Sequence, residues 1–139
     1  MGPDPNNGGE ARREQPRDIN QKPTVIDGDT VRWQGETVRL VGFDTPEKGD
    51  RARCQSERSK GDRATVRLRE LIATGTVTLD LVRCSCPAGT EGTKACNFGR
   101  ACVVLLVDGR DAGRTLIAEG LARPYVCHAT SCPPRGSWC

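Results

Sequence analysis

The chain has 139 residues, of which 28% are charged, 35% are hydrophobic and only 4% are aromatic, and its formal net charge is +3. This composition predicts one domain of ordinary size with a small aliphatic core. The mild basic excess permits an anionic partner without requiring one. No apolar run approaches the roughly 20 residues of a membrane span, so we expect no membrane partner.

Residues 1–22 are polar and show no periodicity, which predicts a disordered N-terminal tail. Residues 23–33 are expected to form a strand, and a turn at 34–36 connects it to a returning strand over 37–43. A proline within residues 44–47 removes a backbone donor, so the chain is expected to leave the sheet there.

The central part of the chain predicts a helix, a strand and a loop. Residues 52–73 carry apolar side chains at helical spacing. Residues 77–82 alternate between apolar and polar, as in a half-buried strand. Residues 84–96 are rich in glycine, proline and threonine and are expected to form a loop.

The last third predicts a strand over residues 99–107, an Asp-Gly turn, and a second helix containing residues 116–121. Residues 127–139 form an irregular cysteine-rich C-terminal segment. Short antiparallel strands with few helices favour an α+β fold, mainly β, built on a small closed barrel.

Cysteines are numerous for a chain of this size: Cys54, Cys84, Cys86, Cys96, Cys102, Cys127, Cys132 and Cys139. An even number favours disulfides and hence a secreted or periplasmic protein, although the chain starts without a recognisable signal peptide. Zinc binding and free thiols are the alternatives, but the close C-x2-C pairs typical of zinc modules are missing from the sequence.

Charged residues gather at the ends of the first predicted strands. Asp27 and Asp29 flank Gly28, and strand alternation would place both carboxylates on one side of the sheet. Two neighbouring carboxylates repel each other, so a cation or a set of donors is expected between them. A plain Asp-Gly turn is the alternative interpretation.

Further along, the charges suit a metal and phosphate site. Asp29, Asp44 and the carbonyl oxygen of Thr45 are the oxygen ligands that Ca²⁺ prefers. Glu47 could take a proton from a bound water, and Arg39 could fork onto phosphate oxygens. Unconnected surface charge is the alternative.

One detail of this segment conflicts with a regular strand. Arg39 and Asp44 are five residues apart, so perfect alternation would direct them to opposite faces. A bulge at Gly42 is therefore expected to reset the alternation.

Three motifs carry a resemblance: Asp-Gly-Asp-Thr at 27–30, Val-Arg-Leu at 38–40 and Asp-Thr-Pro-Glu at 44–47. Together with Phe-Gly-Arg at 98–100 and the later Asp-Gly turn, this order resembles the staphylococcal nuclease (thermonuclease) family. The resemblance covers roughly residues 24–126, with a discontinuity at the loop of residues 84–96.

The resemblance implies a five-stranded OB-fold barrel with two or three helices over residues 23–126. It also implies hydrolysis of phosphodiester bonds in DNA, RNA or both, by a Ca²⁺-dependent endonuclease that leaves 3′-phosphates. No protein partner is evident, and a monomer is expected.

The resemblance also assigns roles to particular residues. Asp29 and Asp44 would bind Ca²⁺ through their carboxylates and Thr45 through its backbone oxygen, with Asp27 supporting the site from behind the ligands. Catalysis is implied for three further residues: Glu47 as general base, and Arg39 and Arg100 as phosphate ligands that stabilise the transition state.

Several features depart from the family pattern. Asn97 and Phe98 replace a lysine–tyrosine pair, and Tyr125 replaces a base-stacking tyrosine only after a one-residue shift. The long C-terminal helix of the family is replaced by the segment 127–139, which disulfides would stabilise. Cys54 is the cysteine that we expect to remain a buried free thiol.

A non-catalytic OB-fold module that binds nucleic acid is the alternative function. The complete set of acids and arginines favours the enzyme over this module, as does the low aromatic content. A zinc-binding or redox-responsive protein built on the cysteines is the third hypothesis.

Overall fold

The computed structural model describes residues 22–139, so the predicted disordered tail lies, except for Lys22, outside the described residues. Eight strands occur in the described part: β1 (Thr24–Asp27), β2 (Thr30–Trp33), β3 (Glu36–Leu40), β4 (Phe43–Asp44), β5 (Val77–Val82), β6 (Ala101–Val107), β7 (Arg110–Asp111) and β8 (Arg123–Pro124). The described part also contains two α-helices, α1 (Gln55–Thr74) and α2 (Ala112–Ala118), and two 3₁₀ turns, η1 (Gly49–Arg51) and η2 (Asn97–Gly99).

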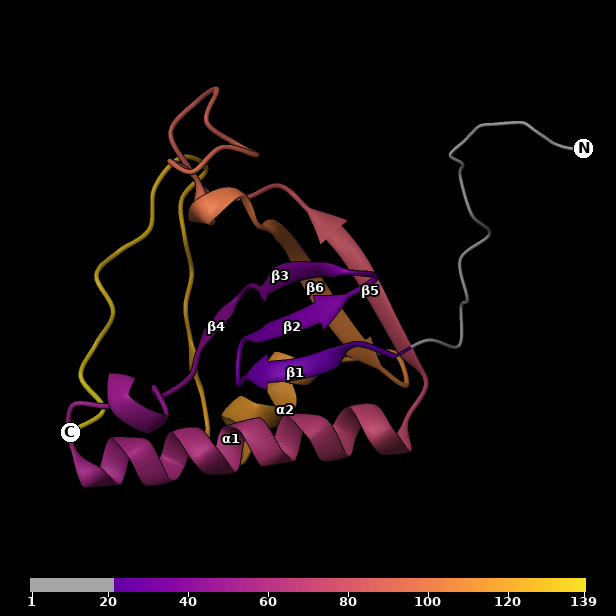
Figure 1. Ribbon diagram of the computed structural model, residues 1–139, viewed down its shortest axis with the longest axis vertical. Coiled ribbons are helices and arrows are strands. Elements are labelled where there is room, and N and C mark those ends of the chain that lie inside the picture. The colour runs from indigo at the N-terminus through magenta and orange to yellow at the C-terminus, as the bar shows by residue number, and fades with distance from the viewer. Residues whose placement is uncertain (1–21) are drawn as a thin grey trace, which may run out of the picture.

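The main sheet has the strand order β1-β2-β3-β6-β5, and β7 pairs with β6 beyond this path. All pairs are antiparallel except β3 and β6, which run parallel. A second, two-stranded sheet joins β4 to β8. The molecule is thus a mixed α+β structure made mainly of strands, and Figure 1 shows the sheet curling around one side of the core.

Both helices close the core of this curled sheet. Helix α1 crosses beneath β1 and contacts α2 (Figure 1). Apart from Cys96, the largest fully buried side chains come from both sheet and helices: Val31, Leu40, Leu68, Val103, Leu105 and Leu116. They are aliphatic, as the composition predicted, and Phe43 is the aromatic residue of the core cluster.

The predicted strand over residues 23–33 is wrong, because the structure has two strands with a tight turn between them. The backbone N–H of Asp29 donates to the Asp27 carboxylate at 3.3 Å across this turn. Side chain–backbone bonding of this kind is how aspartate initiates turns. The alternative interpretation of an Asp-Gly turn is therefore confirmed, and strand alternation does not position Asp29.

The chain also breaks between β3 and β4, where the sequence predicted an irregularity at Gly42. Gly42 has a φ of +96°, a conformation that favours glycine. Strand β3 ends at Leu40 and β4 begins at Phe43. The interruption lets Arg39 and Asp44 lie at the same end of the molecule despite their odd separation.

Helix α1 starts three residues later than the predicted range 52–73 and ends one residue beyond it. Cys54 is its N-cap, and its sulfur accepts a bond from the backbone N–H of Glu57 at 3.4 Å. At the other end Lys22 donates to the carbonyl oxygens of Ile72 at 2.7 Å and Gly75 at 3.0 Å. A lysine at this position complements the negative end of the helix dipole.

All eight cysteines form disulfides: Cys54–Cys139, Cys84–Cys102, Cys86–Cys96 and Cys127–Cys132. The prediction that Cys54 is a free thiol is therefore wrong. Its position at the helix N-cap brings it within reach of the last residue of the chain, which nothing in the sequence around Cys54 indicates.

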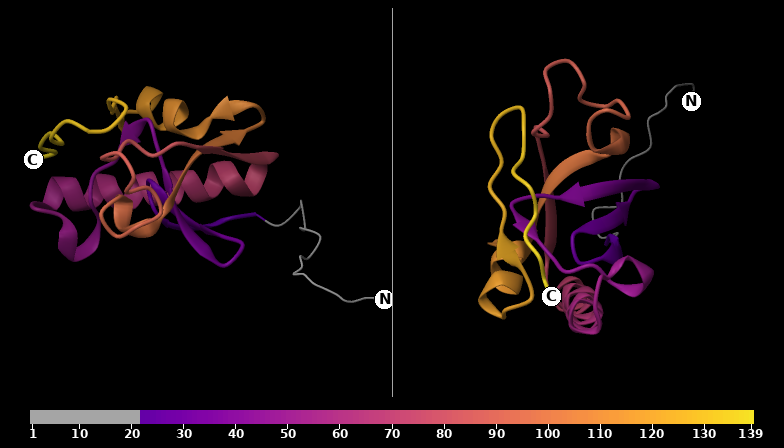
Figure 2. Two further views of the ribbon diagram at one scale, coloured as in Figure 1. Left: turned by 90° about the horizontal axis from the view of Figure 1, so that it is seen from above. Right: turned by 90° about the vertical axis from the view of Figure 1, so that its left-hand side faces the viewer.

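The C-terminal segment (residues 127–139) contains no helix or strand. Figures 1 and 2 show it descending from the top of the molecule, next to the loop of residues 84–96, to the start of α1. Neither α-helix within residues 22–139 combines the length and apolarity needed to cross a membrane.

Candidate active site

The candidate site lies where the β1–β2 turn, the end of β3 and the β4 stretch meet. Gly28 is buried in this turn, and a Cβ at this position would lie 2.9 Å from side-chain atoms of Thr45. The Asp29 backbone is fixed as well, because its carbonyl oxygen accepts the N–H of Leu40 at 2.8 Å. Close packing at Gly28 and the backbone bond from Leu40 thus bring the β1–β2 turn next to Thr45 and the end of β3.

Asp29 is buried at the centre of the site, with 8% of its surface exposed. Its Oδ2 lies 3.1 Å from Nη2 of Arg39, and its Oδ1 accepts a bond from the Thr30 hydroxyl at 3.2 Å. Arg39 is further oriented by its Nε, which donates to the carbonyl oxygen of Leu40 at 3.2 Å. The acid and the arginine therefore form one preorganised unit.

Burial raises the pKa of Asp29 from 3.8 to about 7, against the lowering effect of the Arg39 guanidinium. A hydrogen bond with Asp27 and the charge of Asp27 add to the rise, so these two carboxylates do interact. A buried carboxylate with a raised pKa is short of positive charge, which a bound cation would supply.

Asp44 is buried beside Asp29, with 6% of its surface exposed. Both carboxylates lie within ion-pair distance of one cationic group, the guanidinium of Arg135. The Arg135 Nη1 is 3.9 Å from Asp29 Oδ2 and forms a hydrogen bond with Asp44 Oδ1. The two predicted metal ligands from separate elements thus face a common position.

Thr45 follows directly and is buried as well. Carboxylate and carbonyl oxygens are hard donors that suit Ca²⁺. The positively charged guanidinium of Arg135 already lies within ion-pair distance of both carboxylates. The residues present therefore fit a hard divalent cation, with Asp29 and Asp44 as the residues that would hold it.

Glu47 has an exposed side chain, and its carboxylate forms no hydrogen bond or ion pair within residues 22–139. Its backbone N–H donates to Oε2 of Glu57 at 3.1 Å. Glu57 is buried in the first turn of α1 and also accepts the N–H of Arg53 at 2.8 Å. The loop that carries Glu47 is thereby attached to the helix.

The Glu57 interactions have an electrostatic signature. The backbone bond from Arg53 lowers the pKa of Glu57 below its ordinary value, and the bond from Glu47 lowers it further. Sequence reasoning missed Glu57, although Cys54-x-x-Glu57 has the spacing of a helix capping box with cysteine in place of serine.

Arg100 directly precedes β6, the strand that pairs with β3, and its guanidinium lies within the electrostatic influence of Arg39 and Asp29. Burial lowers the pKa of its guanidinium; the neighbouring Arg39 lowers it further, whereas Asp29 and Asp27 raise it. Asn97 fixes its direction, because Nε donates to the Asn97 carbonyl at 3.0 Å and Nη2 to its side-chain oxygen at 2.7 Å. Two guanidiniums therefore share the field of the same carboxylates.

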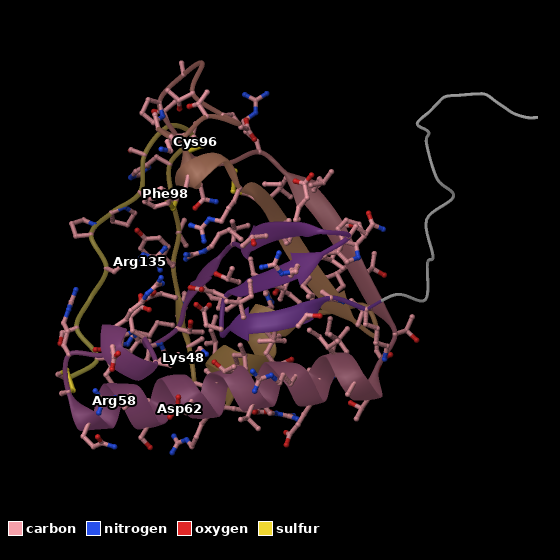
Figure 3. The ribbon with its side chains drawn as sticks, in the orientation of Figure 1. Lys48, Arg58, Asp62, Cys96, Phe98 and Arg135 are labelled. Carbon is pink, nitrogen blue, oxygen red and sulfur yellow. A yellow bond between two sulfur atoms is a disulfide. The ribbon has the colours of Figure 1, made fainter. Side chains whose placement is uncertain are left out.

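The loop of residues 84–96 and the C-terminal segment border a cavity of about 650 Å³ next to Arg39. Tyr125, Asn97 and Arg135 are among the residues that line it. Phe98, in contrast, is largely exposed (Figure 3). The loop thus lies beside Arg39, one of the two predicted phosphate ligands.

Arg135 and Trp138 are site residues that the sequence did not reveal. Trp138 donates from Nε1 to Asp44 Oδ2 at 3.1 Å. Both residues lie more than 90 positions beyond Asp44 in a segment without periodicity. The Cys54–Cys139 disulfide, whose pairing the sequence does not reveal, fixes the end of this segment at the start of α1.

Two proteins of known name are similar to this chain. Endonuclease YncB of Bacillus subtilis (strain 168) is 33% identical over 119 residues, which is 78% of this chain and 52% of that protein. The SPbeta prophage-derived endonuclease YokF of the same organism is 32% identical over 103 residues, or 71% of this chain and 31% of that protein. No family model matches the chain.

The chain thus spans about half the length of the first of these relatives and about a third of the second. Both relatives carry the name endonuclease, and the similarity includes most of the residues that the structure describes. The similarity is therefore consistent with the chemistry of the site without assigning a metal or a product.

Proposed function

We propose that this protein is a Ca²⁺-dependent endonuclease of the staphylococcal nuclease type, which hydrolyses phosphodiester bonds of DNA, RNA or both. The observation that carries the proposal is the convergence of buried Asp29 and Asp44 with Arg39, in a site whose field Arg100 shares. The similarity to two proteins named endonuclease supports it. A curled sheet of five main strands is compatible with the partly open OB barrel that the proposal entails.

The arginines have the task of binding the scissile phosphate. Arg39 is held by Asp29 and Arg100 by Asn97, so neither side chain needs to be ordered when substrate arrives. A phosphodiester is anionic and repels a hydroxide nucleophile. Guanidiniums offset this repulsion, and they do so more strongly as charge builds up on the phosphoryl oxygens in the transition state.

Glu47 is proposed to accept the proton of the attacking water. Its exposed carboxylate is free of protein partners within residues 22–139, and Glu57 fixes the backbone that carries it. When bound at Asp29, Asp44 and the Thr45 carbonyl, Ca²⁺ would supply Lewis-acid stabilisation of the phosphoryl oxygen. Asp27 is proposed to position Asp29. Cleavage of the bond to the 5′ oxygen would leave 3′-phosphates.

Four disulfides favour a secreted or periplasmic location, because such bonds persist in oxidising compartments. We propose that the protein acts there as a monomer on nucleic acid.

The test is cleavage of single-stranded DNA and of RNA in the presence of Ca²⁺ or of excess chelator. We expect cleavage only with Ca²⁺, and a loss of about 100-fold or more in Glu47→Gln, because a positioned general base typically contributes 10²–10⁴-fold. End-group analysis of the products should detect 3′-phosphates.

Asp50→Asn is the matched control, since it makes the same chemical change at an exposed acid of η1 and should retain full activity. Equal activity of Glu47→Gln and the parent protein would reveal a contaminating nuclease or a different base. Tight binding of single-stranded DNA without cleavage under any condition would favour the non-catalytic module instead.

A further inference from the structure

The C-terminal segment follows a path that crosses the candidate metal site. It begins beside strand β8, which pairs with β4 so that Arg123 lies opposite Asp44. Its first residues form a small loop closed by Cys127–Cys132. Its last residue is bonded to Cys54 at the N-terminus of α1. The segment is therefore held at both ends, and it runs from the top of the molecule down to the start of α1 (Figures 1 and 2).

Within this span, both carboxylate oxygens of Asp44 accept bonds from the segment. Oδ1 accepts from Arg135, and Oδ2 accepts from Trp138 at 3.1 Å. The same Arg135 nitrogen lies 3.9 Å from Asp29. In Figure 3 Arg135 extends from the C-terminal segment toward the strands. A guanidinium and an indole N–H thus satisfy the oxygens that would bind Ca²⁺.

The two side chains are themselves supported by aromatic stacking. The Arg135 guanidinium lies 4.4 Å from the ring centre of Tyr125. The Trp138 ring is stacked by Arg123 at 3.7 Å, and Lys60 of α1 lies 5.7 Å from its centre. Cation–π contacts of this kind favour one arrangement of the segment over a freely moving one.

A guanidinium and Ca²⁺ cannot share these oxygens comfortably. Calcium binds carboxylate oxygens at 2.3–2.6 Å, so a cation bound to Asp44 would be in direct electrostatic repulsion with Arg135. Each would have to displace the other. The disulfide keeps Arg135 near the acids at a high effective concentration, which favours the segment in this competition.

We propose that the C-terminal segment is an intramolecular competitor of the divalent cation, with Arg135 occupying Asp29 and Asp44 and the Cys54–Cys139 disulfide holding it there. Binding of Ca²⁺ requires the segment to withdraw, so the apparent affinity for Ca²⁺ is reduced by the fraction of molecules that are open. This inference rests on the proposed Ca²⁺ site.

The first experiment measures Ca²⁺ binding by isothermal titration calorimetry, in the absence of nucleic acid, for the full chain and for Arg135→Ala. We expect the Kd of Arg135→Ala to be about tenfold lower, which is the factor for a site that is open in about one molecule in ten. Arg114→Ala removes the same charge from an exposed position of α2 and should leave the Kd unchanged.

A double variant, Cys54→Ser with Cys139→Ser, keeps Arg135 but releases the end of the segment. It should also bind Ca²⁺ more tightly than the parent chain, because the effective concentration of Arg135 falls. An unchanged or weaker affinity in both Arg135→Ala and this variant would overturn the competition and indicate that Arg135 supports the site rather than blocks it.

A spectroscopic reading follows the movement directly. Trp33 and Trp138 are the two tryptophans of the chain, so Trp33→Phe leaves Trp138 as the single reporter. Titration with Ca²⁺ should shift the Trp138 emission to longer wavelength. The midpoint of this shift should equal the midpoint of Ca²⁺ binding in the calorimetric titration. Calcium binding without any change in this emission would overturn the proposal.

These outcomes separate the two proposals. Calcium binding of equal strength in all variants would leave the proposed nuclease intact and overturn only the competition. No Ca²⁺ binding in any variant, including Arg135→Ala and the double serine variant, would overturn both the Ca²⁺ site and the competition. Circular dichroism of each variant establishes that it is folded.

Discussion

Asp29 combines burial with a net deficit of positive charge, although Arg39 lies beside it. With a pKa of about 7 in the folded protein and 3.8 as its ordinary value, the carboxyl holds its proton more tightly in the folded state. Between these two values the unfolded chain has lost the proton and the folded chain has not. Stability therefore falls as pH rises through this window, and above pH 7 the full cost of the buried charge is present.

Replacement of Asp29 by asparagine should remove this cost. In chelator, we expect Asp29→Asn to raise the free energy of unfolding by roughly 1–4 kcal/mol at pH 8, and by less at pH 5. Urea unfolding at the two pH values measures the difference. Asp50→Asn, at an exposed position, should change stability little at either pH. A stabilisation of Asp29→Asn that is larger at pH 5 would contradict the assignment.

At the scale of single residues, the sequence indicated the types of the site residues better than their placement. Asp27 and Asp29 were expected to share one face of a strand, yet they contact each other through a turn. Arg39 and Asp44 lie at the same end of the molecule because the chain breaks at Gly42. The five-residue spacing of these two residues did predict an irregularity there. Glu57 and Arg135 escaped because they act through the tertiary fold rather than through a local pattern.

Helix α1 positions the loop of Glu47 by close backbone contact at Gly61. A Cβ at Gly61 would lie 2.4 Å from the carbonyl oxygen of Glu47 and 2.9 Å from that of Pro46. Both contacts are with backbone atoms, which cannot rotate away. The helix therefore uses glycine here despite its cost of about 0.5–1 kcal/mol relative to alanine in a helix interior.

Helix propensity alone would predict that Gly61→Ala stabilises the protein. We expect the opposite: a loss of about 1–3 kcal/mol from overpacking, and reduced nuclease activity because the Glu47 loop is displaced. Thermal unfolding and cleavage assays measure the two effects. Ser59→Ala, at an exposed position of the same helix, should be neutral or slightly stabilising. Increased stability of Gly61→Ala would show that the loop can move aside.

The longer elements were predictable because their apolar pattern is repeated several times. This holds for α1 and β5. The Asp-Gly turn after β6 was predictable for another reason: its residue types suit the positive φ that Asp108 and Gly109 both have. The two-residue strands β4, β7 and β8 are too short to carry a pattern. They exist because of their partners, which a single sequence does not reveal.

For the molecule as a whole, the Cys54–Cys139 disulfide closes a loop with a sequence separation of 85 residues, and Cys127–Cys132 closes one of 5. Loop-closure entropy in the unfolded chain grows with the logarithm of this length, so the longer loop should stabilise the protein by about 2.5 kcal/mol more than the shorter one.

This difference can be measured by urea unfolding of two double serine variants. Cys54→Ser with Cys139→Ser should lose about 2–4 kcal/mol of unfolding free energy. Cys127→Ser with Cys132→Ser should lose distinctly less. Equal losses would indicate that local packing rather than the closed loop determines what each bond contributes.

The four disulfides also have an order that concerns how the chain can reach its native state. Cys86–Cys96 lies inside the loop closed by Cys84–Cys102. Both of these disulfides, and Cys127–Cys132 as well, lie inside the loop closed by Cys54–Cys139. No pair crosses another, although eight cysteines allow 105 connectivities. Oxidation can therefore proceed from short loops to long ones without threading the chain. A protease that cuts once between residues 54 and 139 leaves both fragments covalently joined.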